Sequence, residues 1–64
     1  MCLSSVYQKK DGENLFLCRN IAKVIPNKTG VTVFDLMGQK TVIPGQILEI
    51  DLLENTIIIG EEPA

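Results

Sequence analysis

The chain of 64 residues contains no histidine and no tryptophan, and it has only two cysteines. Without histidine it lacks the commonest general base and the commonest metal ligand of proteins. Its glycines form neither a GxGxxG nor a GxxxxGK(S/T) sequence, so no phosphate-binding loop is indicated. Two cysteines, one of them at position 2, cannot build the disulfide framework of a small secreted domain. We therefore expect a cytoplasmic protein with reduced thiols that is not an enzyme.

Long apolar segments and an excess of basic residues are also missing. No run approaches the roughly 20 apolar residues of a membrane span, and charged residues such as Lys9, Lys10 and Asp11 occupy the part of the chain where a signal peptide would be apolar. Six basic and eight acidic residues give a net charge of −2. Because proteins bind nucleic-acid backbones through basic surfaces, neither a membrane nor a nucleic acid is the expected partner.

Turn-forming residues recur at short intervals and separate short runs of β-sheet character. Asp11-Gly12 has the composition of a tight hairpin turn because both residues tolerate positive φ, and no helical periodicity extends over ten residues. This spacing predicts one all-β domain over residues 1–64, a small SH3-like or OB-like barrel of six or seven short strands with a frayed tail at residues 61–64. The predicted strands are Cys2–Gln8, Leu15–Leu17, Ala22–Ile25, Val31–Asp35, Lys40–Ile43, Ile47–Leu52 and Thr56–Ile59.

The size of the chain bears on its oligomeric state. A domain this short buries only roughly 60% of the surface of its unfolded chain, so small folds usually add a disulfide, a metal or a partner chain. The aliphatic run Ile57–Ile59 is more apolar than one face of a small sheet requires. We expect a homodimer in which a second copy shares part of the core. The alternative is a strand buried on both faces inside a monomeric barrel.

Three aromatic residues and one cysteine could belong to a site or to the core. The aromatic residues Tyr7, Phe16 and Phe34 could stack nucleic-acid bases in a barrel groove, but in so small a domain we expect them to form the core. Cys18 follows the apolar run LFL. Because free cysteine is among the most buried residue types, we expect Cys18 to act as a small buried hydrophobe.

Cys2 is the candidate metal ligand because of the donors beside it. If Met1 is retained, the Met1 amine, the Cys2 amide nitrogen and the Cys2 sulfur can close two five-membered chelate rings. If Met1 is removed, the Cys2 amine and sulfur still close one. Nitrogen and thiolate donors in one plane suit Ni(II) or Cu(II), whereas Zn(II) prefers a tetrahedral site. A second copy related by a two-fold axis could complete the plane.

The start MCLSSVY and the late segment PGQILEIDLLENTIIIGEE give the chain a resemblance to the CooT family, small nickel-binding accessory proteins linked to maturation of carbon monoxide dehydrogenase. The resemblance covers nearly the whole chain in length and strand pattern. It implies a homodimer of small barrels related to the HypC hydrogenase-maturation chaperones, and a nickel-binding cysteine that corresponds to Cys2. HypC chains also begin Met-Cys, but they soon continue into Pro-Gly, are commonly longer and carry a later histidine. These differences favour CooT.

The residues and the resemblance together predict a metallochaperone, an accessory protein that holds Ni(II) at Cys2, shared across a homodimer, for a client such as carbon monoxide dehydrogenase. Two alternatives stay open. One is a small nucleic-acid-binding barrel, and the other is a structural or regulatory binding module in which Cys2 has no role.

Overall fold

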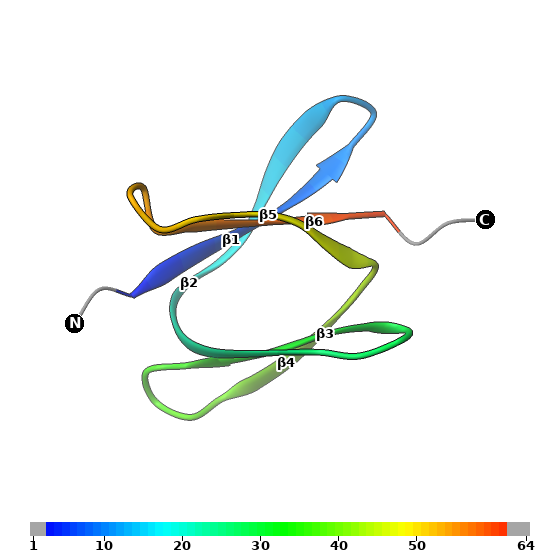
Figure 1. The fold of residues 1–64 in the computed structure, drawn as a ribbon. Helices are drawn as coiled ribbons and strands as arrows, with labels where there is room; N and C mark the ends of the chain where they lie inside the picture. Colours follow the sequence, from blue (N-terminus) through cyan, green and yellow to red (C-terminus); the bar gives the residue numbers. More distant parts are fainter. Residues whose placement is uncertain (1–2, 62–64) are drawn as a thin grey trace.

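The computed structural model describes residues 3–61, and these form one six-stranded sheet without a helix. In the sheet the strands lie in the order β4-β3-β2-β1-β6-β5; β1 and β6 are parallel, and all other neighbours are antiparallel (Figure 1). The predicted all-β fold is thus confirmed. No helix within this part of the chain is long and apolar enough to span a membrane. The strands are β1 (Ser4–Lys10), β2 (Glu13–Pro26), β3 (Gly30–Asp35), β4 (Lys40–Pro44), β5 (Gln46–Asp51) and β6 (Thr56–Gly60).

The long strand β2 shapes the sheet. Two predicted runs, Leu15–Leu17 and Ala22–Ile25, both belong to it. Its pairing with β1 slips twice and its pairing with β3 slips once, each time leaving one extra residue in β2. Asn20, in the middle of this region, has a φ of 60°. Because each bulge bends a strand and increases its twist, β2 stays continuous but turns sharply enough to fold the β3–β4 hairpin over β1 and β6.

The two edges of the sheet approach each other at one corner. β4 and β5 are the end strands of the sheet, yet a single residue, Gly45, joins them. Gln46 pairs with Gly60, so this junction passes beside the end of β6. From the central strand β1, the side-chain Nε2 of Gln8 donates a hydrogen bond of 3.1 Å to the backbone carbonyl of Pro44. The sheet is therefore open in its hydrogen bonding but curled into the partly open form of a barrel.

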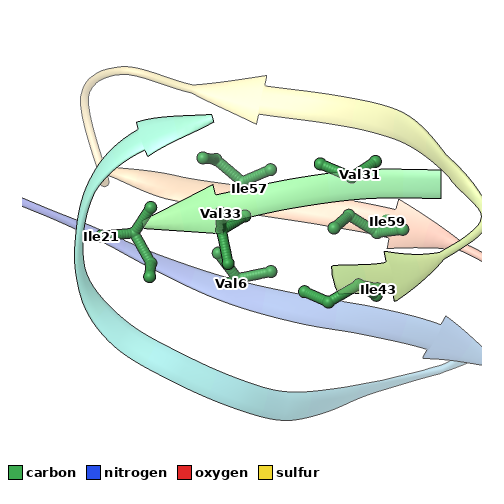
Figure 2. Close-up of a cluster of buried hydrophobic side chains, with 7 residues drawn as sticks. All are labelled: Val6, Ile21, Val31, Val33, Ile43, Ile57 and Ile59. Atoms are coloured by element: carbon green, nitrogen blue, oxygen red, sulfur yellow. The ribbon is translucent and has the colours of Figure 1, made fainter. Parts of the chain in front are cut away.

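The core is aliphatic and lies inside the curled sheet. Ile57 and Ile59 point into it, whereas Ile58 between them faces outward because side chains alternate along a strand. The two inward residues of the run Ile57–Ile59 are therefore already buried within one chain, so this run does not require a core shared with a second chain. Figure 2 shows the seven buried side chains, which come from every strand except β5: Val6, Ile21, Val31, Val33, Ile43, Ile57 and Ile59.

The prediction that the aromatic residues form the core is wrong. Val6 and Val33 occupy the inward positions, so the adjacent Tyr7 and Phe34 fall on the outer face. Tyr7 packs edge-to-face against Phe16, with ring centroids 5.7 Å apart and an interplanar angle of 74°. The Lys23 Nζ lies 5.1 Å from the centroid of the Phe34 ring.

The edge strand β5 leaves apolar side chains uncovered. Its pairing with β6 slips between Ile47 and Glu49, which interrupts the alternation of its side chains. Ile47 packs against the core, but Leu48 and Ile50 stay exposed. The predicted strand also ended at Leu52, which lies in the following turn. This part of the surface therefore has more apolar area than a chain with a complete core needs.

Candidate functional site

The predicted metal ligand Cys2 lies outside the residues that the structure describes. The structure does show where the chain enters the sheet. Ser4 pairs with Ile21 of β2, and the Ser5 amide donates a hydrogen bond of 2.9 Å to the carbonyl of Asn55, just before β6. The chain thus enters in the middle of the sheet, with β2 on one side and β6 on the other.

Two turns flank this start of β1. The β5–β6 turn, residues 52–55, is attached to β1 through the hydrogen bond between Ser5 and Asn55. The β3–β4 turn, residues 36–39, is attached to the bend of β2, because the Leu36 amide donates to the carbonyl of Asn20 at 2.9 Å. Figure 1 shows both turns on the side of the molecule where β1 begins.

The two turns are built in the same way. Asp35 ends β3 and Asp51 ends β5, and one carboxylate oxygen of each accepts hydrogen bonds from two backbone amides of its own turn, at 2.9 or 3.0 Å. Such side-chain-to-backbone bonds hold a turn in one conformation. Both carboxylates therefore have a structural task. The donors are Met37 and Gln39 in the first turn, and Leu53 and Glu54 in the second.

Each aspartate is followed by two large apolar residues that face solvent. Leu36 and Met37 are 64% and 88% exposed, and Leu52 and Leu53 are 80% and 88% exposed. We call these four side chains the apolar turn surface. Both pairs lie at or just beyond the end of a predicted strand, but the strand pattern does not connect them. The sequence does contain a signal that relates the two turns, because the tripeptides DLM (residues 35–37) and DLL (residues 51–53) are similar and each lies at the end of a predicted strand.

Cys18 lies on β2 opposite Val6 and is only partly buried. Its side chain packs against the core, as the sequence predicted. Burial raises the pKa of the Cys18 thiol above its ordinary value, and the nearby Asp35 carboxylate raises this pKa further. Because metal ligation requires the thiolate, this environment makes Cys18 a poor ligand.

We expect Cys18 to react with iodoacetamide several-fold more slowly in the folded protein than in urea, at about pH 8, because the raised pKa lowers its thiolate fraction. The Cys2→Ser variant, in which Cys18 is the remaining thiol, isolates this rate, which mass spectrometry measures. The folded state also holds the thiol proton more tightly, so the stability from Cys18 should fall as pH rises above the ordinary thiol pKa. Equal rates in both states would contradict this prediction.

Among residues 3–61, no three histidine, cysteine, aspartate or glutamate residues lie close enough to hold a metal ion. Asp35 and Asp51 accept hydrogen bonds from their own turns.

One basic and aromatic grouping bears on nucleic-acid binding. Phe34 pairs with Lys23 on one neighbouring strand and with Lys40 on the other, and Lys23 lies over its ring. Two lysines can neutralise few phosphates, whereas non-specific binding depends on the number neutralised. This grouping does not favour a nucleic acid as the partner.

Comparisons with known proteins agree with the fold. Residues 1–60 match the family model described as CO dehydrogenase accessory protein CooT. The crystal structure of a provisionally assigned CooT from Carboxydothermus hydrogenoformans is similar to this chain, with a TM-score of 0.84 and 22% sequence identity over 97% of this chain and 100% of that chain. Among curated proteins, none matches. The family match includes Met1, Cys2 and all six strands.

Proposed function

The chain belongs to the CooT family of CO dehydrogenase accessory proteins, and from this premise we propose that it binds Ni(II) at Cys2 and delivers it to a nickel enzyme such as carbon monoxide dehydrogenase. Nickel is the cargo here and not a resident cofactor. The family match carries the proposal, because it begins at Met1 and its description is that of an accessory protein. We place this activity in the cytoplasm, where the thiol stays reduced.

The position of Cys2 in the chain supports its role as the ligand. It precedes Ser4, the first residue of β1, by two residues in the sequence. If Met1 is retained, its amine and the Cys2 amide nitrogen supply donors that suit Ni(II), and if Met1 is removed, the Cys2 amine supplies one. Cys18, which packs against the core, has no terminal amine beside it.

A homodimer would complete the nickel site. One chain start supplies two or three nitrogen and sulfur donors, whereas a square-planar Ni(II) has four positions, so a second chain start related by a two-fold axis would supply the rest. The exposed apolar residues of the chain are consistent with a protein partner, because soluble monomers rarely expose large contiguous apolar patches.

Calorimetric titration of nickel into the untagged protein tests this proposal. We expect about one Ni(II) per two chains, and an affinity that rises with pH between about 7 and 9, because the thiol and the terminal amine lose protons on binding. A form with tag residues before Met1 should bind more weakly, since the amine is displaced. An affinity independent of pH would contradict ligation by these groups. One Ni(II) per chain would contradict a shared site.

Delivery has its own test. Nickel-loaded protein should activate nickel-free carbon monoxide dehydrogenase in the presence of a chelator that removes free nickel. The Cys2→Ser variant, treated in the same way, is the control. Equal activation by both proteins would contradict delivery from Cys2.

A further inference from the structure

We propose that the free edge of β4, the edge opposite β3, binds an extended segment of another protein by adding it to the sheet as one more strand. The segment carries an acidic side chain where it passes Lys40 and an apolar one where it passes Val42. The inference goes beyond the proposed function and uses no residue of the nickel site. β4 is an end strand of the sheet, and no strand among residues 3–61 pairs with its free edge (Figure 1).

The pairing of β4 with β3 fixes which backbone groups point away from the sheet. At the turn, the Asp35 amide donates a hydrogen bond of 3.0 Å to the Gln39 carbonyl. Opposed residues of an antiparallel pair alternate between hydrogen-bonded and non-hydrogen-bonded positions. Because the register of β3 and β4 is regular, Lys40 and Val42 occupy non-hydrogen-bonded positions. The N–H and C=O groups of Lys40 and Val42 therefore point to the free edge.

The end of β4 supports this assignment independently. Pro44 lies two residues beyond Val42, so its carbonyl should also point away from β3, and it accepts the hydrogen bond from Gln8 of β1. Proline has no N–H to offer a further strand, and its presence limits unspecific pairing at an edge. The chain itself therefore closes this end of the edge, whereas residues 40–42 are exposed.

The same two residues present their side chains on the outer face of the sheet. Residues two apart in a strand share a face, and Val42 is 62% exposed. Phe34 pairs with Lys40 across β3 and β4, and on its other side the Lys23 Nζ lies 5.1 Å from the centroid of its ring. An added strand would therefore meet a lysine and a valine at alternate positions, next to a face that carries a second lysine.

The distribution of charge favours an acidic segment. Residues 20–45 contain three lysines and one acidic residue, Asp35, whose carboxylate accepts two amides of its own turn. Opposite charges on neighbouring strands attract, and like charges directly opposite each other are destabilising. A carboxylate on the added strand is therefore favoured beside Lys40.

The other end strand, β5, is a poorer edge for strand addition. Its register slips between Ile47 and Glu49, and it carries the acidic residues Glu49 and Asp51. A bulge disrupts the regular row of backbone groups that an added strand requires. For the same reason, β5 of a second copy is a poor partner for β4, although its charge is opposite. The regular, basic edge of β4 is therefore the one suited to a segment of another protein.

Short peptides of defined pattern test the edge directly. An antiparallel ladder is slightly more stable per residue than a parallel one, and in this direction the residue opposite Val42 precedes the residue opposite Lys40 by two positions. The blocked peptide Thr-Thr-Val-Thr-Glu-Thr-Thr has the required pattern. Its counterpart with lysine in place of glutamate is the control.

Titration of the isotope-labelled protein with these peptides, followed by NMR, measures binding. We expect saturable shifts of the Lys40 and Val42 amides, and several-fold weaker binding of the lysine peptide. N-methylation of the valine and glutamate of the peptide should abolish binding, because it removes the N–H groups that face β4. Methylation of the threonines that follow each of them should change it little. No shift at millimolar peptide, shifts centred on β5, or equal binding of both methylated forms would overturn the inference.

A charge exchange tests the contact with Lys40. Lys40→Glu should bind the glutamate peptide several-fold more weakly and the lysine peptide several-fold more tightly than wild type does, because the exchanged charges again face each other. Lys9→Glu, at an exposed residue of β1, changes the net charge equally and is the matched control. It should bind both peptides as wild type does. Equal effects of the two substitutions would contradict a contact at β4.

Hydrogen exchange of the free protein shows whether a second copy already occupies the edge. The Thr41 amide, which faces β3, should exchange slowly, and the amides of Lys40 and Val42 should exchange fast. Protection of these two amides that grows with protein concentration would overturn the inference in favour of pairing between copies. Tighter binding of a single-stranded RNA than of the glutamate peptide, at the same ionic strength, would overturn it in favour of a nucleic acid.

Nickel separates this inference from the proposed function. Peptide binding should be the same with and without Ni(II), and the same in Cys2→Ser as in wild type. A wild type that binds the peptide but no nickel would refute the proposed function alone. A wild type that binds nickel through Cys2 but leaves β4 unshifted by the peptide would refute this inference alone.

Discussion

Replacing Cys2 by serine is expected to lower the affinity for Ni(II) by roughly 100-fold or more, since even the loss of an outer-shell partner of a metal ligand costs 10–100-fold. A serine hydroxyl stays protonated at neutral pH and is a harder donor than a thiolate, so it cannot replace the sulfur. Among residues 3–61, the first buried core residue is Val6. Because Cys2 precedes it by four residues in the chain, the substitution should leave the thermal unfolding midpoint nearly unchanged.

Cys18→Ala is the matched control for Cys2→Ser. Cys18 packs against the core, so this variant should lose about 1 kcal/mol of stability, as is typical of a modest core truncation. It should keep its nickel affinity and the absorption band of a thiolate bound to nickel, which Cys2→Ser should lose. Calorimetry and absorption spectroscopy measure both quantities. If Cys2→Ser binds nickel as tightly as wild type, ligation by Cys2 is refuted.

Gly45→Ala is expected to unfold most of the protein. Gly45 has a φ of 120°, which side chains rarely adopt, and an added Cβ would overlap the carbonyl oxygen of Gly60 and lie 3.2 Å from the Cγ2 of Ile59. Both obstacles are part of β6, and Gly45 is the whole connection between the two edge strands. We expect a loss of about 4 kcal/mol or more, which approaches the total stability of a small domain.

Gly12→Ala separates conformational strain from steric overlap. Gly12 also has a positive φ, 79°, but an added Cβ there would have no neighbour within 4 Å. Gly12→Ala should therefore lower the free energy of unfolding by only about 1–2 kcal/mol, the cost of placing alanine in the left-handed conformation. Urea unfolding followed by circular dichroism compares the two variants. Equal losses of stability would show that the corner at Gly45 can relax, and would contradict the close approach of the sheet edges.

Local signals in the sequence are enough to predict the fold class and one turn in detail. Asp11 and Gly12 both have positive φ, 53° and 79°, as their residue types indicated. The separation of apolar runs by turn residues predicted an all-β domain because it reports the backbone preferences of neighbouring residues. The selection of Cys2 as a metal ligand likewise depends on donors adjacent in the chain, and on the family resemblance.

Local signals do not predict strand pairing. The sequence of residues 13–26 contains no pattern that identifies the three extra residues at the bulges of β2. The two predicted runs therefore could not be recognised as one bent strand. The outward position of Tyr7 and Phe16 depends on register, which is set by the partner strand and reverses with a slip of one residue. The inward positions hold the aliphatic residues of the core cluster.

The sequence itself therefore accounts for the position of Cys2 beside Met1 and for two aspartates that each precede a pair of apolar residues. The curled sheet places the turns that follow Asp35 and Asp51 on the two sides of the start of β1, although the aspartates are far apart in sequence. The physical reason is that a turn forms from contacts between neighbours in the chain. The meeting of distant turns at one end of a molecule depends on non-local strand pairing, bulges and the packing of a shared core.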